Sequence, residues 1–312
     1  MLTLRHLDPD SPLGHAILTS GARPEEALPL RVAGGLHALA RADDPDLAPV
    51  YPPNDPTDAA LNAALARMIT ARGDALLPWL ASPPQTNEVA RSAVLIAAGH
   101  WLTARFGLPL HLSELGASAG LNLLWDHYAL ALPGLTLGPL DPVLTLQPDW
   151  QGVPPVLAQP RVLSRAGVDL APLDPVTDCD RLLAYVWADQ TARRQRCQAA
   201  LALATRLRPL VAQGDAADWT EGRLAQRFDG LHLVFHTVAA TYFPPATTAR
   251  LAAALSGAGA RATAARPLAH LSMEYDGPTP GAALTLQIWP TGQVIRLGRA
   301  DFHGRWVTWA AP

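Results

Sequence analysis

The chain has 312 residues, of which 49% are hydrophobic and 16% charged, and this composition is typical of a compact globular protein. Its formal net charge of −3 gives no basic surface for nucleic acid or for an anionic membrane. All 24 basic residues are arginines, which excludes mechanisms that need a lysine Schiff base or a lysine base. We therefore expect neither nucleic acid nor a membrane among its partners.

The cysteines and the apolar runs predict where the protein works. Cys179 and Cys197 lack the spacing of a zinc site or of a disulfide framework, so we expect no metal and a reducing compartment. The N-terminus reaches acidic residues and proline before any apolar core, unlike a signal peptide. The longest apolar run, residues 93–98, is too short to span a membrane. These features predict a soluble, cytoplasmic protein, and they leave its oligomeric state open.

The first third of the chain has the pattern of helices separated by proline loops. Residues 59–71 and 89–106 carry apolar side chains at intervals of three and four. Two prolines precede the second of these segments, so we expect Thr86 or Asn87 to cap its helix and Glu88 to lie in the first turn. We assign residues 1–108 to a helical N-terminal region on the substrate side.

From residue 110 onward the pattern changes to strands separated by helices. Strands are predicted at 110–115, 161–168, 210–213, 231–238 and 268–275, and helices at 119–129, 179–207, 219–228 and 247–256. This alternation predicts an α/β fold with a doubly wound, mostly parallel sheet. A hairpin at 284–289 and 294–297 would add antiparallel strands at the end. The domain would span residues 109–312, with a proline- and glycine-rich insertion at about 130–160.

The segment after the first strand carries the strongest signal for function. Small residues at Gly116, Ser118 and Gly120 form a turn that opens a predicted helix, where a ligand can approach the backbone closely. These three residues spell GxSxG, the nucleophile elbow of serine hydrolases. With Glu114 in front they spell ExGxSxG, which resembles the first motif of methyltransferases that use S-adenosylmethionine.

The hydrolase alternative has weaker support. A nucleophile elbow normally follows several strands, whereas here the motif follows the first convincing strand of the chain. Partners for Ser118 do occur in a suitable chain order, with Asp215 as the acid and His270 or His303 as the base. Ten histidines and many aspartates make such an order common by chance. A buried carboxyl group at Glu114 would also need partners of its own beside a nucleophilic serine.

Two further acids follow predicted strands. Asp169 ends the second strand, where nucleoside-binding folds place an acid on the ribose hydroxyls. The separation of Gly116 from Asp169 is longer than in a compact unit, and the insertion at 130–160 supplies the difference. Asp215 follows the third strand, the place at which methyltransferases with a motif like this one contact adenine. Each of these aspartates has a plain alternative, which is the capping of a helix or a turn.

Several long motifs resemble one bacterial family. QTNEVARSAVL, ELGASAGLNLLWDHY, RAGVDLAPLD, VWADQTARRQR and LVFHTVAATYF are similar to the family catalogued as domain of unknown function 2332, over most of the chain. The chain also resembles class I methyltransferases, although Ser118 replaces a usual glycine. That resemblance implies a Rossmann-like fold that binds S-adenosylmethionine through Glu114, Gly116, Ser118, Gly120, Asn122, Asp169 and Asp215.

Polar residues near the other end of the presumed cleft are candidates for substrate contacts. Gln85, Asn87 and Arg91 are predicted to bind the substrate, at a helix start that covers the cleft. Candidate bases are Glu88, His236 and Glu274. The plain alternative for the cluster at 85–91 is helix capping with a surface pair of Glu88 and Arg91, but four polar groups before an apolar helix favour function. For His236, a core histidine is as good an explanation as a catalytic one.

The function that these patterns favour is transfer of a methyl group from S-adenosylmethionine to a small molecule. Two alternatives remain open at this point. One is a non-enzymatic relative that keeps the fold and binds a ligand, and the other is a serine hydrolase that uses the GASAG turn.

Overall fold

A computed structural model describes residues 7–21, 27–81 and 83–312. The chain divides into two compact units. The first comprises residues 1–86 and 177–195, and the second comprises residues 87–176 and 196–312. The predicted boundary at 108 differs from this division, because the helix at the end of the predicted N-terminal region packs with the second unit.

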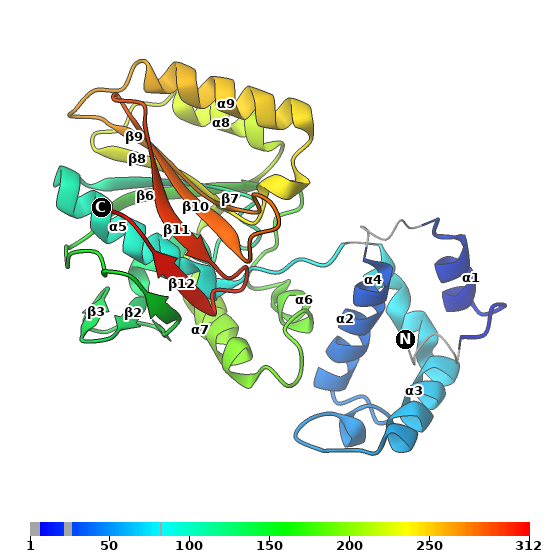
Figure 1. The fold of residues 1–312 in the computed structure, drawn as a ribbon. Helices are drawn as coiled ribbons and strands as arrows, with labels where there is room; N and C mark the ends of the chain where they lie inside the picture. Colours follow the sequence, from blue (N-terminus) through cyan, green and yellow to red (C-terminus); the bar gives the residue numbers. More distant parts are fainter. Residues whose placement is uncertain (1–6, 22–26, 82) are drawn as a thin grey trace. The chain divides into compact units, whose positions relative to one another are not determined.

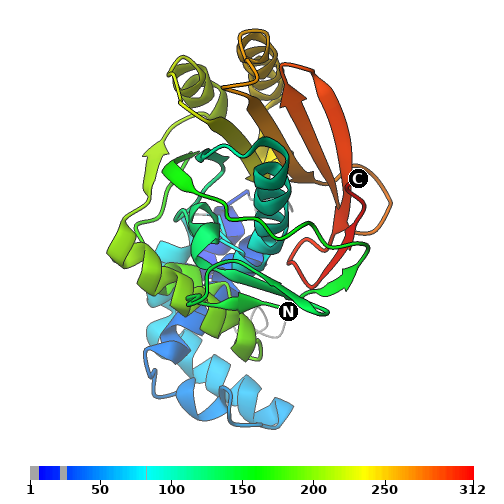
Figure 2. The ribbon, with the colours of Figure 1, turned by 90° about the vertical axis from the view of Figure 1, so that its left-hand side faces the viewer.

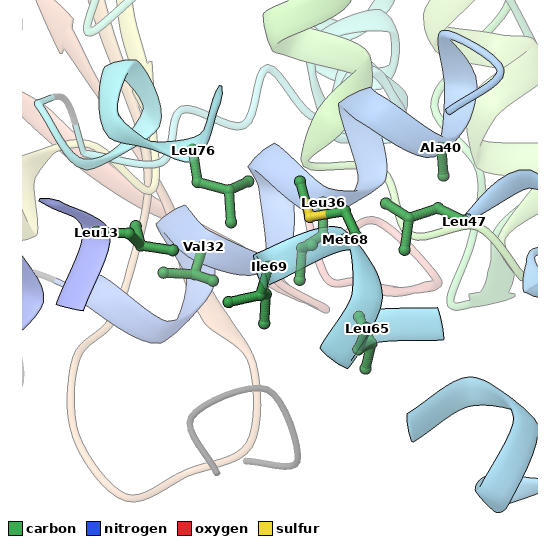
Figure 3. Close-up of a cluster of buried hydrophobic side chains, with 9 residues drawn as sticks. All are labelled: Leu13, Val32, Leu36, Ala40, Leu47, Leu65, Met68, Ile69 and Leu76. Carbon is green, nitrogen blue, oxygen red and sulfur yellow. The ribbon is translucent and has the colours of Figure 1, made fainter. Parts of the chain in front are cut away.

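The first unit is helical in its described part. Its helices are α1 (Pro12–Thr19), α2 (Leu28–Arg41), α3 (Asp58–Arg72), α4 (Leu77–Leu80) and α6 (Cys179–Ala184), with 3-10 turns η3 (Ala48–Val50) and η4 (Gly73–Leu76). Ser11 and Thr57 cap α1 and α3, because their side chains accept hydrogen bonds from backbone amides of the first turn. Figure 3 shows the core of this unit, which consists of Leu13, Val32, Leu36, Ala40, Leu47, Leu65, Met68, Ile69 and Leu76.

The second unit is built on a nine-stranded sheet with the order β5-β12-β11-β10-β9-β8-β1-β6-β7. The strands are β1 (Leu110–Leu115), β5 (Asp149–Gln151), β6 (Val162–Asp169), β7 (Leu210–Gln213), β8 (Leu231–Thr237), β9 (Leu268–Glu274), β10 (Ala282–Trp289), β11 (Gln293–Ala300) and β12 (Trp306–Trp309). The run from β9 to β7 is parallel, and β10 and β11 form an antiparallel hairpin beside it. The predicted α/β class and mostly parallel sheet are confirmed.

Helices cover both faces of this sheet. α8 (Ala216–Leu224) and α9 (Pro245–Gly259) lie together on one face, and α5 (Ser92–Phe106) lies on the other (Figures 1 and 2). Between the sheet and these two helices, α8 and α9, lies a hydrophobic core cluster that consists of Leu115, Val168, Ala216, Val234, Leu251, Leu255, Leu268 and Trp289. On the opposite face, α5 is buried along most of its length, which explains why its sequence is apolar on nearly every side.

The insertion between β1 and β6 is more ordered than its composition suggested. It forms a second sheet, β3-β2-β4, from β2 (Ala129–Leu132), β3 (Leu135–Leu137) and β4 (Thr145–Leu146), and then contributes β5 to the edge of the large sheet. The small sheet lies on the same side as α5 (Figure 2). Its short strands carry too little alternation of polar and apolar residues to be recognised in a sequence.

Two predicted helices were wrong in form. The helix at 119–129 is a 3-10 turn, η6 (Asn122–His127), after which the chain enters β2. Every residue from Asn122 to Trp125 is buried, so the apolar spacing reflects a turn enclosed on all sides and not a helix with one polar face. The helix at 179–207 is two helices, α6 and α7 (Thr191–Leu207).

No helix in the described ranges is both long enough and apolar enough to cross a membrane.

Candidate functional site

The GASAG segment forms a tight turn at the carboxyl end of β1. The amides of Gly116 and Ala117 both donate to the carbonyl oxygen of Val168, at 2.9 and 3.0 Å, which fixes the turn against the end of β6. Gly116, Ser118 and Gly120 have φ angles of 70°, 52° and 71°. Three left-handed residues in five explain why the segment is made of small side chains.

Packing inside the protein explains the two glycines of this turn. A Cβ on Gly116 would lie 2.6 Å from the Cβ of Ala239, and one on Gly120 would lie 3.0 Å from Cγ2 of Val211. The loop after β8 therefore rests directly on the turn. Glycine is required at these positions whether or not a ligand binds.

Glu114 is the unusual group of the site. The residue is only 1% exposed, and its Oε2 atom has no hydrogen-bond partner among the residues that the structure describes. Burial raises the pKa of this carboxyl group well above its usual value, and the negative charge of Asp169 adds to the increase. The charge of Arg91 and a hydrogen bond from Asn122 oppose it. Burial is the largest of these influences, so the Glu114 carboxyl group holds its proton to a higher pH than an exposed glutamate does.

Asn122 is oriented by a residue that the sequence did not single out. The Ser92 hydroxyl donates to Oδ1 of Asn122 at 2.7 Å, and this fixes the amide so that its NH₂ group serves Glu114. Both Ser92 and Asn122 are buried. A serine that follows directly after the polar cluster at 85–91 was the available signal.

The two predicted cofactor aspartates both accept hydrogen bonds from backbone amides. Asp169 accepts from the amide of Ser118 at 2.8 Å and from that of Ala171 at 2.9 Å. Asp215 caps α8 by accepting from the amides of Ala217 and Asp218, and the hydroxyl of Thr247 also donates to it. The Asp169 carboxylate therefore lies beside the GASAG turn, whereas the Asp215 carboxylate is the N-cap of α8.

Residues 87–91 are bonded to the same edge of the sheet. Asn87 accepts from the amide of Leu121 at 3.1 Å, next to the GASAG turn. Arg91 donates to the carbonyl oxygens of Phe302 at 2.8 Å and Thr237 at 2.9 Å. The structure therefore brings Asn87 to the turn and the charge of Arg91 near Glu114, while Gln85 belongs to the first unit.

The helix start at residue 88 differs from the predicted one. Glu88 itself is the cap, because its Oε1 accepts from the amide of Ala90, and a 3-10 turn, η5 (Val89–Arg91), precedes α5. Neither Thr86 nor Asn87 has this role, since the Asn87 side chain bonds across to Leu121. The second oxygen of Glu88 lies 3.8 Å from Nδ1 of His303, which is half exposed.

His236 and Glu274 bond to each other at the ends of β8 and β9. Nδ1 of His236 lies 2.6 Å from Oε1 of Glu274, and its Nε2 lies 3.1 Å from Nε2 of His270. The amides of Ala239 and Ala240 also donate to Oε1 of Glu274. Burial works against ionisation of Glu274, but His236 and these amides outweigh it and lower its pKa. Burial and the nearby His236 lower the pKa of His270 to about 3.

Glu114 and the His236–Glu274 pair face opposite sides of the sheet. Leu115, Val234 and Leu268 belong to the core beneath α8 and α9. Because side chains alternate along a strand, His236 and Glu274 share that face, whereas Glu114 points toward α5 and η6. In the register of the two strands, Glu114 is paired with Phe235 and not with His236. The structure does not bring the predicted bases at 236 and 274 to the Glu114 side.

The acid and one base of the hydrolase alternative are also separated. The hydrogen bonds of Asp215 go to α8 and Thr247, and that of His270 goes to His236. In the described chain neither of them bonds to the other.

A bacterial family described as "Uncharacterized protein conserved in bacteria (DUF2332)" matches residues 2–309. The chain belongs to this family. No curated protein and no solved structure matches it. Because the family description gives no activity, the function of this DUF2332 protein has to be argued from its site.

Proposed function

We propose that this DUF2332 protein binds S-adenosylmethionine at the GASAG turn and transfers its methyl group to a small molecule. The observation that carries the proposal is the Oε2 atom of Glu114, a buried carboxyl oxygen to which no group in the described part of the chain donates a hydrogen bond. An acceptor left unsatisfied in the interior is costly, and a cationic ligand group would offset that cost. The amino group of S-adenosylmethionine is such a group.

The position of the turn supports the same proposal. The sheet runs from β1 through β6 and β7 on one side, and through β8 and β9 on the other. Ligands of open α/β sheets bind beyond the carboxyl ends of the strands where the order reverses, and the turn lies at that point. A methyltransferase-like Rossmann fold is part of the proposal. The terminal β10–β11 hairpin and the 3-10 turn after β1 would be this family's own variations.

Each polar group near the turn has a role in the proposal. Glu114 would hold the amino group of the cofactor, and Asp169, on the neighbouring strand, would accept from the ribose hydroxyls. When bound, the cofactor supplies an electrophilic methyl group, and the protein contributes alignment and removal of a proton from the acceptor. Of the three predicted bases, Glu88 belongs to the segment bonded to the turn, and we assign proton removal to it.

Access to Glu114 requires movement, because the residue is 1% exposed. The segment 87–91 is connected to the turn through Asn87 and to two other loops through Arg91. We infer that this segment opens when the cofactor enters, so that binding is slower than diffusion.

Calorimetric titration with S-adenosylmethionine tests the proposal. The ligand at 100 times its dissociation constant should add about 2.7 kcal/mol to the free energy of unfolding, which appears as a higher melting temperature. Because burial raises the pKa of Glu114 and a bound cation would lower it, cation binding should favour release of a proton from this carboxyl group. The apparent binding heat should then differ between buffers of different ionisation enthalpy at the same pH.

Two variants give the test its controls. Glu114→Gln should abolish the proton release and weaken binding about tenfold or more, whereas Glu221→Gln, at an exposed carboxylate on α8, should change neither. Formation of S-adenosylhomocysteine after addition of a bacterial small-molecule extract would then report methyl transfer. Absence of heat and of any thermal shift at millimolar cofactor contradicts the proposal.

A further inference from the structure

A cavity of about 250 Å³ lies on the α5 side of the second unit, apart from the turn. By volume it has room for about eight water molecules or for one small organic molecule. None of the residues proposed to hold the cofactor lines it. Its walls come from α5, η6 and two loops of the insertion, and consist of Ile96, His100, Trp125, Asp126, Tyr128, Gly138, Pro139, Leu140, Ala158, Gln159 and Pro160.

His100 offers a hydrogen-bond donor to this cavity. Its Nδ1 accepts from the amide of Ala158 at 3.1 Å. Burial lowers the pKa of the ring to about 4, so the imidazole is neutral and its one proton is on Nε2. Within the described ranges no group accepts from this Nε2, although the residue is only 1% exposed.

Trp125 has a second donor, which lies within the cavity wall. The residue is 1% exposed, and its Nε1 is sealed from solvent and has no hydrogen-bond partner among the described residues. The ring cannot turn away easily, since it packs edge-on against Gly99, where a Cβ would lie 2.2 Å from the ring. A fixed indole N–H without an acceptor is uncommon in a protein interior.

The remaining walls combine apolar side chains with polar groups, among them Gln159, and carry no unbalanced charge. Ile96, Pro139, Leu140 and Pro160 are apolar, and Leu140 is fully exposed at the rim. Both carboxylate oxygens of Asp126 accept from Arg165, at 2.6 and 2.9 Å, so this ion pair is complete in itself. The Tyr128 hydroxyl donates to the carbonyl oxygen of Leu121.

We propose that this cavity is a second ligand site, for a small uncharged molecule with an apolar body and one hydrogen-bond acceptor. An aromatic ketone, ester or amide has this chemistry. Its oxygen would accept from Nε2 of His100 and, once the wall shifts to uncover it, from Nε1 of Trp125. Its hydrocarbon part would lie against Ile96 and Leu140. The site is independent of the cofactor proposal, because it shares no residue with it.

Three probes of similar shape separate the contributions. Acetophenone has a carbonyl acceptor, α-methylstyrene replaces the carbonyl oxygen with a CH₂ group, and benzoate adds a negative charge. Titrations followed by ligand-observed NMR should rank acetophenone first and α-methylstyrene about tenfold weaker, because the two donors then stay unpaired. Benzoate should bind weakest, since the cavity offers no free cation.

Variants of the wall locate the binding. Trp125→Phe keeps the aromatic bulk and removes one donor, so it should weaken acetophenone about tenfold and leave α-methylstyrene unchanged. Trp219→Phe, on the opposite face of the sheet, should leave both affinities unchanged. Leu140→Glu changes only the exposed rim and should weaken both neutral probes, which keeps the test usable if Trp125→Phe fails to fold. Equal affinity for acetophenone and α-methylstyrene, or no binding of any probe, overturns the proposal.

Discussion

Glu114 and Glu274 lie at the same edge of one sheet, but their surroundings shift the pKa of the two carboxyl groups in opposite directions. Glu274, at the end of β9, has His236 and two backbone amides as partners, and these lower its pKa. Glu114, near the end of β1, has a side-chain hydrogen bond from Asn122 and an Oε2 atom without a partner, and burial raises its pKa. The chain itself supplies donors to the Glu274 carboxylate, whereas one oxygen of Glu114 has no donor among the described residues.

This difference indicates which of the two carboxyl groups needs a partner from outside the chain. A carboxylate that the chain itself surrounds with donors is part of the structure, even at an edge where ligands bind. A carboxyl group that stays unsatisfied in the interior is a cost that a functional role would explain. The proposed cofactor site is therefore on the α5 face, with Glu114, and not on the α8 and α9 face with His236.

Truncation of Glu274 is expected to have the largest effect on stability. Glu274→Ala leaves the His236 ring and the amides of Ala239 and Ala240 without an acceptor, and should lower the free energy of unfolding by about 3 kcal/mol. Urea denaturation measures the change. Glu274→Gln, which keeps an oxygen acceptor, should cost less than half as much. A loss below about 1 kcal/mol for the alanine variant would mean that the two carboxyl groups do not differ as described.

Substitution of Gly116 should come second. Gly116→Ala combines a φ of 70° with a Cβ 2.6 Å from Ala239, so we expect a loss of about 2 to 3 kcal/mol. Gly107 provides a matched control, because its φ is 63° and nothing lies within 4 Å of the position of a Cβ. Gly107→Ala should cost about 1 kcal/mol, from backbone strain alone. Equal losses in the two variants would show that the contact with Ala239 is unimportant.

The sequence predicted the sheet better than the site. The strand at 110–115 and the hairpin at 284–297 were recognisable because alternation and turn residues are local signals. The face on which each strand end points is not local. It depends on register, and only the pairing of Glu114 with Phe235 places His236 on the opposite face.

The same reason explains the remaining misses. Asn87 and Thr86 looked like helix caps because capping is judged from neighbours in the sequence. The bond of Asn87 to Leu121 and that of Ser92 to Asn122 join segments about thirty residues apart, and no local pattern predicts such a bond. The 3-10 turn after GASAG was missed because its apolar spacing is also that of a helix.

The next largest effect should be the pH dependence of the free energy of unfolding, which distinguishes Glu114 from Glu274. The pKa of Glu114 is raised in the folded protein, so its contribution is complete below about pH 4.5 and is lost as the pH rises toward the folded value, by about 1.4 kcal/mol per pH unit. The pKa of Glu274 is lowered, so its contribution is lost only as the pH falls below about 4.5. Glu114→Gln should remove the loss on the alkaline side. The free energy of unfolding, measured by urea denaturation, could instead have the same pH dependence in the wild-type protein and in Glu114→Gln. The Glu114 carboxyl group would then be ionised in the native protein.

Replacement of Ser118 by glycine should have the smallest effect and distinguishes two functions. Its φ of 52° favours glycine, while the greater freedom of glycine in the unfolded chain opposes it, so the free energy of unfolding should change by less than about 1 kcal/mol. The amide that donates to Asp169 remains in place. In a methyltransferase, Ser118→Gly restores the small residue usual at this turn, and affinity for S-adenosylmethionine should stay within about threefold. In a serine hydrolase the same change removes the nucleophile. A fluorophosphonate probe that labels the wild-type protein and not Ser118→Gly would therefore refute the methyltransferase proposal. Such labelling would show that Ser118 is an exposed, reactive nucleophile and that Glu114 does not bind S-adenosylmethionine there.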